Sequence, residues 1–417
     1  MKRHSDIRIV LSVIAPLLVM LFAAGCSEDD ATGPATPTPM RALTAEETSI
    51  NRANSGFAFA LFDRVAAAEG QKNVFLSPLS VSMALGMTMN GAAGDTWEGM
   101  REALQLDAMS AHAMNHAWKG LRDLLLSADP AVTLTVANSI WSRDGFTVTQ
   151  SFIDTNRYYF DAEVRTLDFS DAGAADVINS WVSEKTRDRI PSIVEGPIPP
   201  LTMMYLINAV YFKGNWSTQF DPARTQDAPF HPATGAQQSV PLMQREGRMR
   251  HLSNGSLQMV DLPYGWDRFN MAVLLPNEGQ DIAALRASLA EPGTWETLYG
   301  SLSERSMLLF LPRFRMEYEV GLSGVLAAMG MEKAFQPGVA DFTGINPARE
   351  LHISDVKHKT FVEVNEEGTE AAAVTSVEVG TTSVPPTMRV DRPFIFVIHE
   401  RNTGAVLFVG QVNDLQN

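Results

Sequence analysis

The side chains that most often carry chemistry follow no common catalytic pattern in this chain. It has 8 histidines and 1 cysteine among 417 residues. It contains no Gly-x-Ser-x-Gly nucleophile elbow, no phosphate-binding glycine loop that ends in lysine, and no His-Glu-x-x-His metal helix. His112 and His116 could share a helix face, but two histidines alone make a weak metal site. We therefore expect that the chain is not an enzyme and that it has no metal site and no cofactor.

A segment near the C-terminus has the composition of a strand that can move. Beyond Gly368, the side chains of Thr369–Val379 alternate between a small, uncharged set and a set that carries Glu370 and Glu378. Strand side chains alternate faces with period two, so the pattern is typical of a half-buried strand. The large residues that normally drive strand burial are scarce here. Such a segment can enter a sheet or stay outside it, which makes it a candidate switch.

Local pattern alone leaves plainer readings of this segment open. Glu366–Ala373 could end a helix, although Gly368 costs about 1 kcal/mol inside one. An ordinary edge strand is another reading, and a surface linker is a third, since Gly, Thr and Ser are common loop residues. Taken without its surroundings, the segment favours a linker over an edge strand, and an edge strand over a switch.

The N-terminus has the features of an export signal. Lys2 and Arg3 precede an apolar run from Ile9 to Ala24, which is shorter than the ~20 residues that a membrane-spanning helix needs. Small residues then lead directly to Cys26, the only cysteine. This order resembles a bacterial lipoprotein signal, in which the cysteine is lipidated and becomes the mature N-terminus. An ordinary signal peptide with an incidental cysteine is the alternative.

Three segments follow from this resemblance: a signal peptide (1–25), a tether (26–48) rich in Pro, Thr and acidic residues, and a folded domain (49–417). We expect an exported protein without an intramolecular disulfide, facing the extracellular space and anchored to a bacterial membrane by a lipid on Cys26. Ser27, in place of Asp, resembles the choice for the outer membrane or the cell surface in a host with two membranes.

The charge of the chain argues against nucleic acid as a partner. The net charge is −15, and removal of residues 1–25 would take away a net +2 and leave −17. We see no basic footprint for a heparin-like polyanion; the segment His112–Leu126 carries only Lys119 and Arg122, as an ordinary amphipathic helix does. No repeat or linker divides the remaining chain, and we expect a monomer.

Helical and strand patterns are interspersed without regular β-α-β alternation, which favours an α+β fold. Ser55–Ala68 has helical spacing, and Ser77 followed by proline is a good helix start. A turn at His399–Gly404 would join the last two strands as a hairpin. The predicted strands are Thr133–Asn138, Leu206–Phe212, Phe269–Leu275, Met307–Leu311, Phe394–Ile398 and Val406–Val409.

The chain resembles the serpin family over about residues 50 to 414, because it carries eight motifs in the same order as members of that family. One of them, at 208–216, is very specific. The motifs are Asn73-Val-Phe-Leu-Ser-Pro-Leu-Ser-Val-Ser-Met-Ala-Leu85, Asn208-Ala-Val-Tyr-Phe-Lys-Gly-Asn-Trp216, Leu262-Pro-Tyr264, Leu311-Pro-Arg-Phe314, Met329-Gly-Met-Glu-Lys-Ala-Phe335 with Asp341-Phe342, Val364-Asn-Glu-Glu-Gly-Thr-Glu-Ala-Ala-Ala373, Arg392-Pro-Phe-Ile-Phe396 and Val406-Leu-Phe-Val-Gly-Gln-Val412. The chain departs from the family at one motif: the usual Thr-x-Gly-Lys-Ile reads Thr186-Arg-Asp-Arg-Ile190, which we expect to alter a local turn and to leave the mechanism intact.

The resemblance implies a serpin fold of three β-sheets with about eight to nine helices and an exposed reactive-centre loop at about 366–392. It also implies a metastable suicide-substrate inhibitor of serine proteases. A target protease attacks the loop and forms an acyl-enzyme, and the cut loop then inserts as a strand of the main sheet. The hinge and insertion residues carried over are Glu366, Glu367, Gly368, Thr369, Glu370, Ala371, Ala372, Ala373 and Val374.

Whether such a chain inhibits depends on the side chains that insertion buries. A charge at Thr369, Ala371 or Ala373 would add a desolvation penalty of several kcal/mol, and none is charged. No proline interrupts Gly368–Val384, where it would remove a ladder donor. The sequence therefore predicts an active inhibitor. A non-inhibitory serpin-fold binding protein, whose loop is cleaved without trapping, is the alternative; a lipoprotein hydrolase is a third reading with little support.

The remaining site residues follow from the same resemblance. Serpins typically place roughly seventeen residues from the hinge glutamate through the scissile carbonyl, which gives the bond Thr382–Ser383, to within one or two residues. A small β-branched residue there suits the shallow apolar pocket of elastase-like or subtilisin-like proteases. Ser77, Ser80, Asn208 and His358 match a polar cluster beneath the opening sheet, and Trp216 matches the position where insertion begins. The plainer reading of His358 is an ordinary hydrogen-bonded core histidine, and that of Trp216 is core packing.

Overall fold

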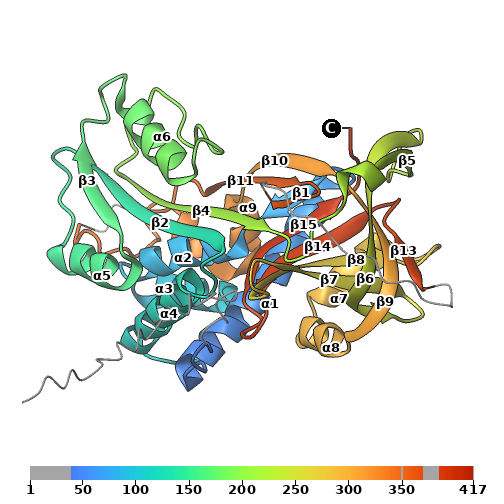
Figure 1. Cartoon of the computed structure of the whole chain (residues 1–417). Coiled ribbons are helices and arrows are strands. Elements are labelled where there is room, and N and C mark those ends of the chain that lie inside the picture. The colour runs from blue at the N-terminus through green and yellow to red at the C-terminus, as the bar shows by residue number, and fades with distance from the viewer. Residues whose placement is uncertain (1–38, 349–350, 370–384, 417) are drawn as a thin grey trace, which may run out of the picture. The chain divides into compact units, whose positions relative to one another are not determined.

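Figure 1 shows a computed structural model of the chain, which describes residues 39–348, 351–369 and 385–416. In these residues nine α-helices and three β-sheets form the α+β architecture of the predicted serpin fold. Short helical turns occur at Pro222–Arg224, Ala327–Met331 and Glu332–Phe335. The helices are α1 (Ala45–Glu69), α2 (Pro78–Met89), α3 (Gly94–Ala103), α4 (Ala111–Leu126), α5 (Gln150–Phe160), α6 (Ala174–Lys185), α7 (Ile282–Leu289), α8 (Thr294–Gly300) and α9 (Ser323–Leu326).

Two of the sheets flank the hinge. One has the order β12-β4-β2-β3, in which β2 (Val132–Arg143) lies between β4 (Met204–Asn215) and the parallel strand β3 (Glu163–Leu167). The other consists of β10 (Phe314–Gly321) and β11 (Lys357–Val364). Within the described residues, β4 pairs with β2 and β12, whereas β11 pairs with β10 alone. No backbone ladder therefore links β4 and β11 in that part of the chain.

The largest sheet forms the rest of the core, with the order β1-β15-β14-β8-β7-β6-β9-β13 and with β5 paired to β6. Its central strands β8, β14 and β15 are buried along their whole length, and β14 and β15 form the predicted hairpin. The strands are β1 (Val74–Leu76), β5 (Gln226–Phe230), β6 (Gln238–Ser253), β7 (Leu257–Tyr264), β8 (Phe269–Pro276), β9 (Ser303–Pro312), β13 (Thr387–Arg389), β14 (Phe394–Glu400) and β15 (Val406–Val412).

Local capping chemistry decides where the first two helices begin. Thr44 and Glu47 form a reciprocal capping box, so α1 starts at Ala45, inside the segment 26–48 that the sequence assigned to the tether. The α2 helix begins as expected, because the Ser77 hydroxyl accepts a hydrogen bond from the Ser80 amide and Pro78 occupies the first helical position.

Helices cover both faces of the β2–β4 sheet (Figure 1). The α6 helix packs on one face, where Trp181 meets Trp141 and Ile207 in a separate small core. The α2 helix lies on the other face, against the main core. The sheet edge that faces β11 is therefore held between two layers of helices. Of the helices described, none is both long and apolar enough to span a membrane.

Candidate functional site

A tight turn brings the hinge back toward β4. The backbone amide of Asn365 donates to the Gly368 carbonyl at 3.0 Å. The Asn365 side-chain oxygen accepts from the backbone amides of Glu367 and Gly368 at 3.0 and 3.2 Å. The chain thus reverses after β11, and β12 (Gly368–Thr369) pairs antiparallel with Asn215 and Gly214 of β4. Two residues of the predicted insertion segment already form a strand of this sheet.

Glycine is the only residue type that fits at position 368 without strain. Its φ of 144° lies in a region that side chains rarely adopt. A Cβ atom at this position would lie 2.3 Å from the Gly214 carbonyl oxygen and 2.6 Å from the Asn215 Cα. The glycine therefore lets the hinge backbone approach β4 closely enough to pair.

Thr369, the second residue of β12 and part of the predicted insertion segment, is buried and hydrogen-bonded. Its hydroxyl lies 3.0 Å from that of Tyr264, and burial raises the Tyr264 pKa far above its ordinary value. The Tyr264 ring stacks on Trp216, with ring centroids 4.3 Å apart. The Trp216 indole in turn donates to the Asn365 carbonyl at 2.9 Å, and the Trp216 amide donates to the Glu367 carbonyl at 2.8 Å. Trp216 thus holds the hinge turn from two sides.

Glu366 anchors the start of the turn. It is 4 % exposed, and its carboxylate accepts hydrogen bonds from the Arg313 guanidinium and the Thr225 hydroxyl. Burial alone would raise the Glu366 pKa, but the bonds from Arg313 and Thr225 outweigh it and hold the pKa below its usual value. Glu366 is therefore ionised and paired at neutral pH.

Three of the four residues predicted to lie beneath the sheet meet there. The Ser77 amide donates to His358 Nε2 at 2.9 Å, and the Ser77 hydroxyl donates to the Leu407 carbonyl at 3.0 Å. Because Nε2 accepts, we assign the imidazole proton to Nδ1. Burial lowers the His358 pKa to about 4. The Ser80 hydroxyl reaches the Asn208 carbonyl at 3.4 Å, so Asn208 joins this cluster through its backbone.

The side chain of Asn208 turns away from the cluster. Its amide nitrogen donates to the Asn138 side-chain oxygen at 2.6 Å, and the Asn138 amide nitrogen donates to the Phe160 carbonyl at 2.7 Å. The Asn208 side chain therefore links β4 to β2. His358, on β11, is hydrogen-bonded by Ser77 instead. Asn138 was not predicted, and its only signal in the sequence was a polar residue inside an apolar strand.

Three more hinge contacts were also missed: Tyr264, Arg313 and Thr225. Tyr264 and Arg313 belong to motifs that carried the resemblance, but those motifs do not show which residues face the hinge. The other predicted site residues lie outside the described residues. They are Glu370, Ala371, Ala372, Ala373, Val374, Thr382, Ser383 and Cys26.

The two histidines considered as metal ligands lie on α4. The ring centroids of His112 and His116 are 4.4 Å apart, and the Tyr159 hydroxyl is 3.0 Å from His112 Nδ1. No group of three or more His, Cys, Asp or Glu that could hold a metal ion occurs in the part of the chain that the structure describes. The pair thus has an aromatic neighbour rather than a third metal-binding side chain.

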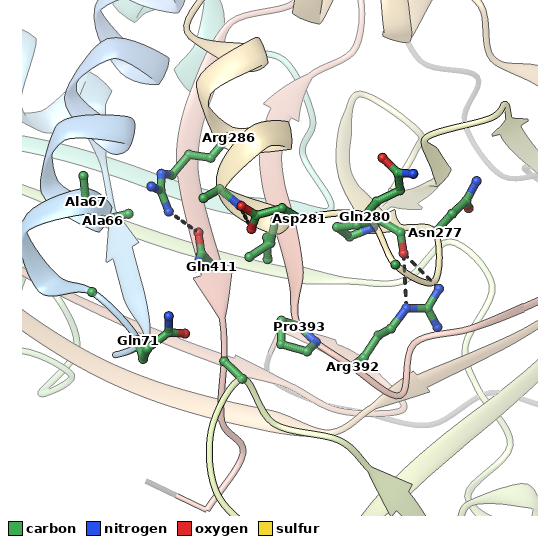
Figure 2. A pocket seen from close by; sticks show the side chains of 16 residues that line it. Ala66, Ala67, Gln71, Asn277, Gln280, Asp281, Arg286, Arg392, Pro393 and Gln411 are labelled. Carbon is green, nitrogen blue, oxygen red and sulfur yellow. Dashed lines mark hydrogen bonds between the residues drawn. The ribbon is translucent and has the colours of Figure 1, made fainter.

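A cavity of about 440 Å³ lies between the end of α1, the start of α7 and the start of β14 (Figure 2). Two of the residues that line it are arginines. Arg286 donates to Asp63 at 2.8 Å and to the Gln411 side-chain oxygen at 3.1 Å. Arg392 donates twice to the Pro276 carbonyl, at 3.2 and 2.9 Å. Both guanidinium groups are thus held by protein acceptors.

Comparison with known proteins agrees with the fold. The family model described as "Serpin (serine protease inhibitor)" matches residues 52–415. A serpin-like protein of Thermococcus kodakarensis is 36 % identical, over 93 % of this chain and 90 % of the relative.

Solved structures show the same likeness. Native tengpin, a thermophilic serpin, superposes with a TM-score of 0.81 at 30 % identity and covers 91 % of this chain and 97 % of its own. Human thyroxine-binding globulin in complex with thyroxine gives 0.82 at 28 % identity, over 89 % and 100 %. Because the family model matches residues 52–415 and these relatives and structures cover most of the chain, this chain belongs to the serpin family.

Proposed function

We propose that this serpin inhibits serine proteases by loop insertion, and that it is consumed in the process rather than acting as an enzyme. The protease serine attacks the carbonyl carbon at the scissile bond and forms an ester, and the amine of the following residue leaves with a proton. The freed loop then enters as a new strand beside β4, between β4 and β11, before water can hydrolyse the ester. The product is a covalent one-to-one complex.

The pairing of β12 with β4 is the observation that carries this proposal. Gly368 and Thr369 run antiparallel to β4, and a strand that continued in this register would extend along the same edge. Within the described residues that edge has no other partner strand. A sheet edge is a template for a further strand. The start of insertion therefore needs no rearrangement of the hinge.

The side chains that follow support continued insertion. Thr369 points into the core, so a strand that continued from β12 would bring Ala371 and Ala373 to the same face by alternation. Neither carries a charge or a bulky group that would oppose burial. A chain that formed the hinge but carried charges at these positions would be expected to insert slowly.

The proposed scissile bond joins Thr382 and Ser383. A small β-branched residue fits a shallow apolar specificity pocket, so elastase-like or subtilisin-like proteases are the proposed targets. Val379, Thr381 and Val384 would suit the same pocket, and the proposed protease class is therefore insensitive to a shift of one or two residues. Thr382→Arg should transfer inhibition to a trypsin-like protease.

A second candidate is a non-inhibitory serpin-fold binding protein. The cavity beside α1 and α7 and the likeness to thyroxine-binding globulin favour it. The two arginines that line this cavity are already hydrogen-bonded to protein groups, however, so a charged ligand would have to displace those bonds. The hinge geometry has no role in this candidate function, and we therefore rank it second.

One experiment separates the two candidates. A protein of residues 39–417, which adds the start of α1 and the residues before it to the predicted domain 49–417, is mixed with an elastase-like protease. A denaturing gel is then run to detect a covalent complex near equal stoichiometry. The inhibitor forms such a complex. Cleavage without a complex, followed by a large rise in melting temperature, would mean that insertion is too slow to trap the protease and would favour the binding protein. Turnover of a small ester without loop cleavage would favour a hydrolase.

We also propose that the chain is exported and anchored to a membrane through a lipid on Cys26. The support is the sequence order of a basic start, an apolar run, small residues and the only cysteine. Replacement of Cys26 by Ala should move the protein from the membrane fraction to the soluble fraction. A protein that stays in the membrane fraction after this change would contradict the anchor.

A further inference from the structure

The segment Thr186–Ile190, where the chain departs from the usual family motif, forms an unusual turn after α6. Arg187 and Asp188 have φ values of 51° and 62°, a left-handed conformation that residues other than glycine rarely adopt. Asp188 stands where the motif has glycine. Its amide donates to the Ser183 carbonyl at 2.8 Å, and its carboxylate accepts from the Ser183 hydroxyl at 2.7 Å. The turn is therefore fixed by hydrogen bonds in place of a glycine.

The turn directs its two arginines to opposite sides of the insertion path. The Arg187 guanidinium carbon lies 5.3 Å from the ring centroid of Tyr211 on β4. For Arg189 the corresponding distance is 4.9 Å, to Phe361 on β11. Both distances are those of cation–π contacts. One short segment thus contacts both β4 and β11, the two strands between which the loop would insert.

The register of β12 shows why this position matters. Thr369 pairs with Gly214, so each further inserted residue would lie one position earlier on β4, and the path reaches Tyr211 after three more residues. A small cavity of about 20 Å³ lies here, lined by the segment 186–190, β4, β11 and Thr369. A cavity of this size holds about one water molecule. The segment therefore lies over the part of the path that insertion enters next.

We infer that Arg187 and Arg189 form an arginine clasp across the insertion path, and that release of this clasp sets the rate of insertion. The inference rests on the proposed function, because only a chain that inserts its loop is delayed by such a contact. A strand that enters between β4 and β11 must move these strands apart or displace the segment, and either movement breaks at least one of the two contacts. The clasp thus prolongs the uncleaved state.

Two other arginines serve as matched controls. Arg315, on β10, contacts the same Phe361 ring at 5.2 Å but lies on the same side of the path as β11. Arg165, on β3, contacts Trp141 at 5.2 Å, away from the path. Loss of either removes one cation–π contact, one charge and one exposed ion pair, with Glu317 or Glu163, without opening the clasp.

The test measures insertion without a protease. A synthetic peptide with the sequence of residues 368–382 is incubated with the uncleaved domain, and its uptake is followed by native gel and by the rise in melting temperature. The double variant Arg187→Met, Arg189→Met keeps the apolar stems and removes both cations. We expect it to take up the peptide about tenfold faster than the wild type, the effect of two lost cation–π contacts on the barrier. Arg315→Met and Arg165→Met should match the wild type.

The outcomes distinguish the clasp from the proposed function. If the wild type takes up the peptide and the double variant is no faster, the clasp is wrong while loop insertion stands. Equal acceleration in Arg165→Met would also overturn the clasp, because a general loss of stability would then explain the rate. If the wild type takes up no peptide at all, the proposed function fails, and the clasp fails with it. An unchanged circular dichroism spectrum confirms that each variant is folded.

Discussion

The hydroxyl groups of Thr369 and Tyr264 lie 3.0 Å apart inside the core, although the two residues are 105 positions apart in the sequence. The Tyr264 ring stacks on Trp216, and Trp216 holds the Asn365 carbonyl through its indole. The Thr369 side chain is therefore buried with its hydroxyl hydrogen-bonded, as a buried polar group must be. Changes at Thr369 act directly on this contact.

Thr369→Arg should abolish the covalent complex and leave loop cleavage intact. The position is 5 % exposed, so an arginine would either bury an unpaired charge, at several kcal/mol, or force the hinge out of the sheet. Glu370→Arg is the matched control, because alternation places that side chain on the opposite face. A denaturing gel measures the trapped fraction. Trapping by Thr369→Arg at the wild-type level would show that this face is not buried during inhibition.

Gly368→Ala should destabilise the domain more than a glycine replacement at a similar turn. Its Cβ would meet the Gly214 carbonyl oxygen at 2.3 Å. Gly279 also has a positive φ, 79°, but open space surrounds its Cβ position. We expect Gly279→Ala to cost about 1 kcal/mol through strain alone, and Gly368→Ala about 1–3 kcal/mol more through the clash. Urea unfolding measures both; equal losses would mean that the close approach to β4 contributes nothing.

The sequence predicted the elements whose formation depends on nearby residues. The Ser77–Pro78 helix start, the apolar strands and the hairpin between β14 and β15 all follow from short-range chemistry, and the structure has each of them. The start of α1 differs, because the capping box of Thr44 and Glu47 extends the helix into a stretch whose composition resembled a tether. A cap uses two residues, so composition over a longer window hides it.

Contacts between distant segments were not predictable from the sequence. Glu366 was assigned to the hinge, but its partner Arg313 is 53 positions away, and no local pattern indicates that the two meet. Asn208 was assigned to the polar cluster, yet its amide faces Asn138 on the neighbouring strand. Which neighbour a side-chain amide faces depends on the spacing of strands. On one side β4 pairs with β2. On its other side, the described residues contain no continuous partner strand.

Arg313→Ala should weaken the hinge anchor. The change leaves the buried Glu366 carboxylate without its cation, and because the Arg313 side chain is 43 % exposed, solvent screening reduces the loss to about 1–2 kcal/mol. Since the folded-state pKa of Glu366 is lowered, its contribution is present at neutral pH and disappears as the pH falls through that value. Arg248→Ala, which breaks the exposed pair with Glu304, is the control. Equal urea midpoints for the two variants would contradict the anchor.

His358 predicts a separate loss of stability in mild acid. Its Nε2 accepts the Ser77 amide hydrogen, which an imidazolium cannot do, and burial lowers its pKa from 6.5 to about 4. The unfolded chain binds a proton that the folded chain excludes between these two values. Stability from this group is therefore complete above about pH 6.5 and falls as the pH approaches 4, by about 3 kcal/mol in all.

The variant His358→Gln separates this loss from the titration of carboxylates. Glutamine keeps an acceptor that can face the Ser77 amide but does not titrate. Between pH 7 and pH 4.5, urea unfolding should therefore show a steeper loss of stability for the wild type than for the variant, because carboxylates contribute equally to both. The difference should develop mainly above pH 4.5, where few carboxylates titrate. Parallel curves for the two proteins would show that the His358 proton is not excluded from the folded core.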